Sequence, residues 1–340
     1  MIKYFIKRLL LLVPTILGVS LITFFLLQFL PGGPLEIQLY NSQMNSVESG
    51  ISSSYSSFNI PEKTLNEMKA YYGFDKPILT RYFIWLKGIV TGNLGNSTYY
   101  SEPVSELIFS RIPISLFFGG IGFILTYLIC VPLGIAKALR HKSKFDMLTS
   151  AIVLGGYTIP GWAFGSLALI LFGGGSFFNI FPLGGFVSED FSTLSFFGKI
   201  GDLLYHSVLP LAAYMISGFA TLTILTKNSV IDNISQEYVR FAYAKGLNNR
   251  RIRNKYILKN SLIPIVTGFG NIFAVVVSGS LLIEKVFNIQ GMGLLAFNSI
   301  LNRDYPVSMG IIIISSFLLI FGNIISDIIY ALVDPRIKFK

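Results

Sequence analysis

Six apolar runs constrain the fold of this chain more than any other feature of its sequence. Each is about 20 residues or longer, the length that a helix needs to cross a hydrocarbon core of about 30 Å. A segment in lipid must satisfy its backbone hydrogen bonds internally, so each run is expected to be a helix. The six predicted spans are residues 9–30, 114–139, 147–172, 206–227, 261–283 and 307–332.

The composition favours the same class. Hydrophobic residues make up 52% of the 340 residues and charged residues only 13%, whereas an ordinary soluble domain is about 25% charged. The formal net charge of +10 would indicate a nucleic-acid partner only on a soluble fold with a basic patch. The single cysteine, Cys130, lies inside an apolar run. It therefore forms no intrachain disulfide, and no metal site built on cysteines is predicted.

The distribution of Lys and Arg predicts the orientation. If the N-terminus is cytoplasmic, most of the 27 Lys and Arg fall in cytoplasmic segments, as the positive-inside rule expects. Six spans then place both termini and residues 229–260 in the cytoplasm. The first span follows a basic start like that of a signal peptide, but it is too long and lacks a small-x-small cleavage site, so we interpret it as a retained anchor.

These assignments divide the chain into three parts. Residues 1–30 form the N-terminal anchor helix, residues 31–113 an external helical insertion, and residues 114–340 the core. Within the insertion, residues 41–59 are rich in Ser and Asn and are predicted to be flexible. Helices are expected over 61–73 and 78–90. The insertion is either a cap on the membrane end of the bundle or a gate or docking surface for a soluble partner.

Catalytic motifs are missing from the sequence. The two histidines, His141 and His206, are predicted on opposite sides of the membrane, and no H-E-x-x-H, G-x-S-x-G or Walker A pattern occurs. No catalytic residue, metal site or bound cofactor is therefore predicted for this chain. The main candidate for intramembrane chemistry is Asp327, which shares a helix face with Asn323. That face serves either interhelical hydrogen bonding or the lining of a pore.

Small residues and prolines within the spans indicate how the helices pack. Gly161 and Gly165 form a G-x-x-x-G pattern, which predicts a close helix contact. Pro132, Pro160 and Pro210 are expected to bend their spans.

The segment EYVRFAYAKGLNNRRIRNKYILKNSLIPIV, residues 237–266, is basic where the rest of the chain is apolar. Its pattern predicts a helix, a break and a second helix that runs into the fifth span. Asn233 and Ser235 are candidate caps of a first helix ending at Lys245, with Gly246 in a left-handed turn after it. Leu247 is expected to fold back on this helix, and Asn248 or Asn249 is expected to cap the second.

Two interpretations of this hairpin stay open on physical grounds. A basic loop can set the topology and touch anionic lipid. Alternatively, a first helix too short to span the membrane lies across the cytoplasmic mouth and offers aromatic side chains to a groove on a partner. In the second interpretation one helix face carries Tyr238, Phe241, Ala242 and Lys245.

At EYVRFAYAKGLNNRRI the chain resembles the permeases of ABC importers, in which this loop is called the EAA loop. Over essentially its whole length it is similar to the B-type permeases of dipeptide and oligopeptide importers. It most resembles the Yej-type permeases of peptide and microcin C uptake. The motifs that carry the resemblance are KRLLLLVPTILGVSLITFFLLQFLPGGP, GNLGNS, PVSELIFSRIPISL, HSVLP, LTKNS, GSLLIEKVFNIQGMGLL, RDYPVSMG and NIISDIIYALVDPRIKF.

The resemblance implies an all-α membrane protein, a bundle of six transmembrane helices like that of type I ABC importer permeases. It implies a bacterial inner-membrane location and a role in importing peptides or peptide-like compounds. The implied partners are a second homologous permease, two cytoplasmic ATPase domains that bind ATP and Mg²⁺, and an extracytoplasmic solute-binding protein. No nucleic acid is implied.

The resemblance also implies functional residues. The residues expected to couple to the ATPase are Glu237, Tyr238, Arg240, Phe241, Ala242, Tyr243, Ala244, Lys245, Gly246 and Leu247. Pore or gate candidates are Glu284, Asn323 and Asp327; for Glu284 an ion pair with Lys285 or Arg303 is the alternative. The chain departs from the family pattern where Arg240 replaces the glutamate of the EAA motif and where Asn93 replaces an aspartate.

Two rival functions remain to be distinguished: an ion-driven carrier, and an intramembrane enzyme acting alone through Asp327. An importer subunit is expected to copurify with ATPases, whereas a carrier or an enzyme is not.

Overall fold

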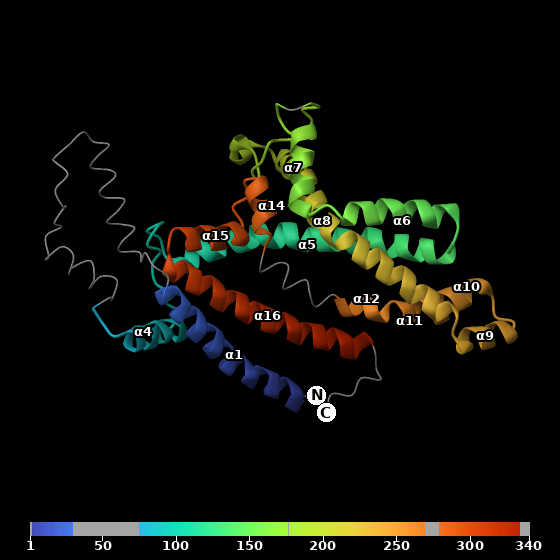
Figure 1. The fold of residues 1–340 in the computed structure, drawn as a ribbon, viewed down its shortest axis with the longest axis horizontal. Coiled ribbons are helices and arrows are strands. Elements are labelled where there is room, and N and C mark those ends of the chain that lie inside the picture. Colours follow the sequence, from blue (N-terminus) through green and yellow to red (C-terminus); the bar gives the residue numbers. More distant parts are fainter. Residues whose placement is uncertain (1, 30–74, 176, 269–278, 334–340) are drawn as a thin grey trace. The chain divides into compact units, whose positions relative to one another are not determined.

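The computed structural model describes residues 2–29, 75–175, 177–268 and 279–333, and helices dominate them (Figure 1). The principal helices, in chain order, are α1 (Ile2–Phe29), α4 (Ile78–Val90), α5 (Val104–Leu139), α6 (Lys144–Tyr157), α7 (Gly161–Phe172), α8 (Phe196–Ile234), α9 (Glu237–Ala244), α14 (Leu281–Val286), α15 (Met292–Leu301) and α16 (Tyr305–Val333). Shorter elements are η1 (Glu189–Thr193), α10 (Asn249–Arg251), η2 (Ile252–Leu258), α11 (Lys259–Ser261) and α12 (Ile263–Thr267).

The predicted all-α membrane class is confirmed. Four helices within the described ranges are long and apolar enough to cross a membrane: Leu10–Phe29, Val104–Leu139, Phe196–Ile234 and Tyr305–Ile328. The bent pair of α6 and α7 supplies a fifth candidate. Most of the predicted fifth span, 261–283, lies outside the described residues or in short helical pieces, so the count of six is not reproduced directly.

The predicted third span is wrong as a single helix. α6 and α7 are bent by 96° at the break between Tyr157 and Gly161, which makes this segment a broken span or a re-entrant loop. Pro160 explains the break, because proline lacks a backbone N–H and disfavours helical geometry at Ile159 before it.

Two helices are longer than predicted. α5 has 36 residues and begins at Val104, and α8 has 39 residues and begins at Phe196. At 1.5 Å per residue they measure about 54 and 58 Å, well beyond a bilayer core of about 30 Å. Both helices contain proline, Pro113 and Pro132 in α5 and Pro210 in α8. Their ends therefore extend past the apolar runs that the sequence displays.

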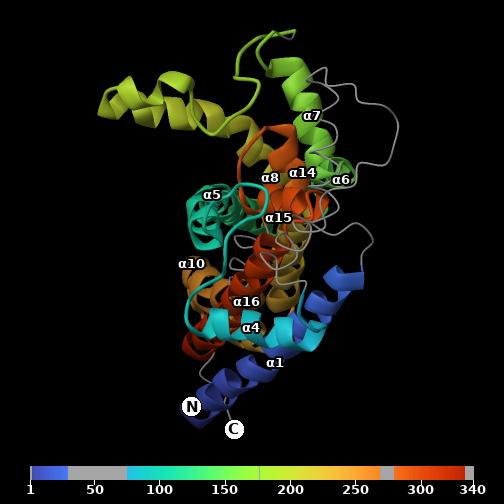
Figure 2. The same cartoon turned by 90° about the vertical axis from the view of Figure 1, so that its left-hand side faces the viewer.

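The chain divides into two units, each described by itself. The first consists of 1–8, 111–294 and 318–340, and the second of 9–110 and 295–317. In the second unit, α4 packs across α1 (Figure 2). Phe24 and Leu27 of α1 meet Tyr82 of α4 and Met309 of α16 in an apolar cluster. The helix predicted over 78–90 is thus confirmed, whereas the segments 41–59 and 61–73 lie outside the described residues.

The second unit also brings together two of the sequence motifs. Asp304 of RDYP is fully buried, and its carboxylate accepts hydrogen bonds from the Ser97 hydroxyl at 2.5 Å and the Thr98 backbone N–H at 3.2 Å. The loop after GNLG is therefore fixed by a buried carboxyl group 207 residues away in the chain, which gives a physical reason for both motifs.

In the first unit, α5, α7, α8 and α14 enclose a common apolar core. The G-x-x-x-G pattern lies in its seam. A Cβ on Gly161 would lie 2.6 Å from the Ala213 carbonyl oxygen, and one on Gly165 would lie 2.8 Å from the Phe287 ring. The predicted close helix contact is confirmed as an intrachain contact of α7 with α8 and α14.

A single methyl group is therefore expected to disturb this seam. Gly161→Ala should lower the free energy of unfolding by about 1–3 kcal/mol, the usual cost of overpacking, since the backbone of α8 cannot rotate away. The measurement is the thermal unfolding midpoint in detergent. Gly155→Ala is the matched control, because a Cβ at Gly155 meets nothing within 4 Å. Equal midpoints for the two variants would contradict the tight seam.

Candidate functional site

The basic segment folds as a hairpin at the end of α8 (Figure 1). α9 follows α8 after two residues and turns into α10 and η2. Val239 and Ala242 of α9 are buried against Val230 of α8, Ala138 of α5 and Ile252 and Ile257 of η2. The hairpin is therefore anchored on α5 and α8 by an apolar contact and is not a loose basic loop.

The outer face of α9 is aromatic and exposed. Phe241 is 61% exposed, Tyr243 51% and Tyr238 37%. The Lys245 ammonium lies 4.5 Å from the centroid of the Phe241 ring, a cation–π arrangement. An exposed aromatic stripe on a short helix is the kind of surface that fills a groove on a partner.

One predicted face assignment is wrong. Ala242 was expected beside Tyr238 and Phe241, but it is buried with Val239. Residues 239 and 242 lie three apart on the side of α9 that packs against α8, so they form the anchor. Of the other predicted coupling residues, Glu237, Arg240 and Ala244 are exposed.

The turn after α9 has the predicted chemistry. Gly246 has φ of +73°, a left-handed conformation in which glycine is favoured. Its N–H donates to the Tyr243 carbonyl at 2.9 Å, and the Leu247 N–H donates to the Ala242 carbonyl at 3.3 Å. This is the Schellman pattern. Leu247 packs against the apolar anchor, so both predictions for the turn are confirmed.

The predicted caps of the first helix are wrong, because α8 continues to Ile234. Ser235 is the C-cap of α8, and the N-cap of α9 is Gln236, which makes no side-chain cap bond. Asn233 instead accepts a hydrogen bond from the Tyr238 hydroxyl at 2.5 Å. Asn248 does cap the second arm, accepting from the Arg250 N–H at 2.9 Å.

The second arm is not one regular helix. α10 passes into the π-helical segment η2, and α11 and α12 follow with a break at Leu262. Pro264 stands at the start of α12 and cannot donate a backbone hydrogen bond to the preceding turn. The hydroxyl of Ser229 on α8 donates to the Ser261 carbonyl at 2.8 Å. This hydrogen bond connects the two arms just after η2.

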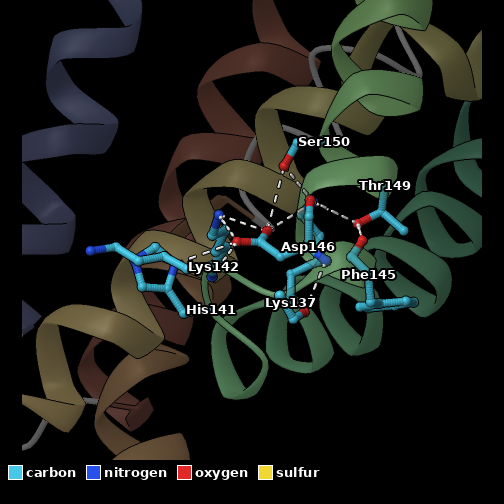
Figure 3. Close-up of polar contacts among 9 residues, drawn as sticks. Lys137, His141, Lys142, Phe145, Asp146, Thr149 and Ser150 are labelled. Carbon is cyan, nitrogen blue, oxygen red and sulfur yellow. Dashed lines mark hydrogen bonds and ion pairs between the residues drawn. The ribbon is translucent and has the colours of Figure 1, made fainter.

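A buried charge cluster lies at the stem of the hairpin (Figure 3). The Lys227 ammonium of α8 donates to both carboxylate oxygens of Asp146 of α6, at 2.7 and 2.8 Å. The Lys137 ammonium of α5 lies 3.3 Å away, and its side chain is 1% exposed. His141 Nδ1 lies 3.4 Å from the same carboxylate. The cluster therefore joins α5, α6 and α8.

Sequence reasoning missed this cluster, although a signal was present. Lys137 and Lys227 both lie at the ends of predicted apolar spans, where a buried cation needs an acidic partner. Asp146 immediately precedes another predicted span. Pairing them required knowing that α6 folds back beside α5, which the spacing alone does not show.

Comparisons with known proteins agree with this geometry. The family model described as "Binding-protein-dependent transport system inner membrane component" matches residues 130–339, which contain the hairpin and its stem. The chain belongs to this family of ABC transporter permeases. It is thus a multi-pass inner-membrane protein.

Individual relatives match over nearly the full chain. The peptidoglycan transport system permease protein YejB of Agrobacterium fabrum is 38% identical, with 99% of this chain and 98% of the relative covered. The inner membrane ABC transporter permease protein YejB of Escherichia coli O157:H7 is also 38% identical, with 99% of each covered. The oligopeptide transport system permease protein AppB of Bacillus subtilis is 32% identical over all of both chains.

In this permease, Glu284 is held in a tight cradle. The carboxylate is buried and accepts hydrogen bonds from the Leu294 N–H at 2.7 Å and from Ser115 and Tyr214 hydroxyls at 3.3 and 3.4 Å. A Cβ on Gly291 would lie 2.5 Å from it. Glu284 of α14 thus ties the start of α15 to α5 and α8, and a gate role stays a prediction.

The alternatives for Glu284 are partly resolved. Lys285 is exposed, and within the described part of the first unit no ion pair joins it to Glu284. Arg303 belongs to the second unit, so that pairing remains untested.

The remaining pore candidates of the permease lie on α16. Asn323 is exposed and Asp327 half-buried, one helical turn apart and on the same face as predicted. Their contribution to a pore stays a prediction.

The structure predicts a specific effect of Glu284→Gln. An amide offers one carbonyl oxygen in place of two acceptors, so an N–H donor would face the Leu294 or Ser280 N–H. A buried donor left without an acceptor costs about 1–3 kcal/mol. We expect the unfolding midpoint in detergent to fall accordingly. Glu106→Gln, on the same helix as Ser115 but exposed, should leave the midpoint unchanged; a similar fall in both would contradict the cradle.

Proposed function

We propose that the chain is one permease subunit of an ATP-driven bacterial importer for peptides or peptide-like compounds, of the microcin C type. It forms half of the translocation pathway beside a second, homologous permease. ATP and Mg²⁺ bind to two ATPase domains in the cytoplasm, and an extracytoplasmic solute-binding protein delivers the substrate. The names of the relatives, peptidoglycan and oligopeptide transport permeases, support the peptide class.

The observation that carries the proposal is the two-sided character of α9. Its inner face, Val239 and Ala242, is packed into the protein, while Tyr238, Phe241 and Tyr243 face outward. A helix built in this way transmits a push from outside to the helices that hold it. ATP-driven closure of the ATPase pair would move α9 and switch the pathway from inward to outward access. This requires a helix bundle with two states, whose equilibrium is shifted both by the ATPases and by the transported substrate.

No specific observation supports either rival function. The intramembrane enzyme depended on Asp327, and the solitary carrier does not account for an exposed aromatic helix on a membrane permease. The family match supports the importer instead.

The direct test is reconstitution. The chain is expressed with its neighbouring transport genes, purified with the associated ATPases and placed in proteoliposomes with the solute-binding protein. Uptake of a labelled peptide is expected to require ATP, Mg²⁺ and the binding protein together. Uptake without ATP would favour a carrier, and hydrolysis of the peptide without ATP would favour an enzyme.

The orientation proposed for the hairpin is testable through cysteine accessibility. The single Cys130 is buried and can be replaced by serine to give a thiol-free background. A membrane-impermeant maleimide is expected to label Glu189→Cys, in the exposed η1, on intact spheroplasts. It should label Asn249→Cys, in the exposed hairpin turn, only after permeabilisation. Labelling in the opposite order would overturn the cytoplasmic placement of the hairpin.

A further inference from the structure

The two arms of the hairpin are built differently. The first arm is α8, a continuous α-helix to Ile234 that leads into α9 after two residues. The second arm contains the π-helical η2 and then the break at Leu262 before Pro264. Mid-helix departures of this kind often mark hinges. We expect a displacement of α9 to be carried by the continuous α8, while η2 and the break at Leu262 let the second arm adjust.

The first arm is fastened to its neighbours by the charge cluster. Lys227 lies two turns before the end of α8 and contacts both carboxylate oxygens of Asp146. Asp146 Oδ2 also accepts the Lys142 backbone N–H at 3.1 Å. This pair spans from α8 to the start of α6, and α8 is the helix that continues into the hairpin.

The other lysine of the cluster, Lys137, links α5 to α6. Lys137 of α5 donates to the Thr149 and Ser150 hydroxyls at 2.8 Å and to the Asp146 carbonyl at 3.0 Å. Its three N–H groups thus all have acceptors on α6. Lys137 therefore fixes α5 to α6 independently of Lys227, and Lys227 is the ionic link between that pair of helices and α8.

This ion pair resists separation, because the Lys227 ammonium, on a side chain only 16% exposed, would be left without a counter-charge in a poorly solvated place. A weak surface contact would instead let α8 slide past α6 when α9 is pushed. The Lys227–Asp146 pair is therefore suited to transmitting movement of α8 to α6.

We propose that the Lys227–Asp146 pair is the joint through which movement of the hairpin reaches α5 and α6, so that both are positioning residues for the coupling of ATP hydrolysis to transport. The inference rests on the proposed importer function. It goes beyond it by assigning the mechanical link to two side chains outside the coupling loop.

The test uses the complete transporter with both permeases, the ATPases and the binding protein in proteoliposomes. Lys227→Met cuts the ion pair with α8 and leaves one buried cation, Lys137, beside one buried anion, Asp146. We expect the ATPases to remain bound and to hydrolyse ATP, while the number of peptides imported per ATP falls about tenfold or more, within the usual range of coupling effects. Lys227→Arg is expected to restore the wild-type ratio, because guanidinium contacts a carboxylate equally well.

Lys144→Met serves as the matched control. It removes a lysine two residues before Asp146 in the chain, at an exposed position at the start of α6, and should leave the ratio unchanged. If Lys227→Met does not assemble, Lys227→Gln also cuts the ion pair. It keeps a polar side chain beside Asp146 and leaves the Lys137–Asp146 pair in place.

The outcomes separate the inference from the proposed function. A wild-type ratio in Lys227→Met overturns the joint while the importer stands. Parallel loss of hydrolysis, bound ATPase and transport in the second variant as well would show that the pair serves stability alone, which also overturns it. If the wild-type complex imports no peptide with ATP and binding protein, the proposed function itself fails, and the joint falls with it.

Discussion

Phe241→Asp is expected to detach the ATPase subunits from the transporter. Phe241 is the most exposed aromatic side chain of α9 at 61%, and aromatic residues at the centre of an interface commonly contribute 2 kcal/mol or more. Placing a carboxylate in the partner's groove adds the cost of desolvating a charge. We therefore expect affinity to fall by at least about 30-fold.

The measurement is copurification of the ATPases in mild detergent, followed by titration to obtain the dissociation constant. Tyr243→Asp, on the same exposed face, should act in the same direction. Tyr99→Asp is the matched control: Tyr99 is 57% exposed but lies in the segment predicted on the other side of the membrane. Unchanged affinity in Phe241→Asp and Tyr243→Asp would show that α9 is not the docking helix.

A substitution of Gly246 in the hairpin turn distinguishes the effect of the backbone conformation from that of direct contact with the ATPase. Gly246→Ala adds one methyl group where nothing lies within 4 Å, so it creates no clash with the chain. The left-handed backbone at +73° nevertheless costs a non-glycine residue about 1–2 kcal/mol. We expect a smaller loss of ATPase affinity than for Phe241→Asp, measured in the same titration. Ala244→Gly, at a helical position before the turn, is the comparison; a loss as large as that of Phe241→Asp would imply direct contact at Gly246.

Local signals in the sequence were sufficient for several elements. Helix α4 occupies 78–90 as predicted, because its boundaries are set by neighbouring residues. Gly246 and Leu247 form the expected turn because the Schellman pattern is determined within six residues. The G-x-x-x-G seam was predicted in kind, since two small residues four apart always lie on one helix face.

Features that depend on contacts between distant segments were not predictable in the same way. α8 continues past its apolar run to Ile234, where Val230 packs against the hairpin, and hydropathy does not show this contact. The 96° bend after α6 was predicted only as a possible distortion at Pro160, since a proline does not specify the size of a kink. Ala242 was placed on the wrong face because a short basic helix shows no clear apolar side until its neighbours are known.

Asp146→Asn is expected to destabilise the permease more than any other single substitution considered. It leaves the buried Lys137 and the partly buried Lys227 without the carboxylate that both approach. Removing one partner of a buried ion pair typically costs about 3–5 kcal/mol, because the remaining charge is uncompensated. The measurement is thermal unfolding of the purified subunit in detergent, with Asp232→Asn, an exposed carboxylate on α8, as the control.

The same site allows the charge effect to be separated from the loss of packing. Lys227→Met leaves one cation and one anion and is expected to cost clearly less than Asp146→Asn. Adding Lys227→Met to Asp146→Asn should recover part of the lost stability, since it removes one unpaired charge. A double-mutant cycle then gives the coupling energy between the two positions. Purely additive effects would mean that the two groups do not interact. In that case the short distances would carry no energetic weight, and α8 would be held to α6 by its apolar contacts alone.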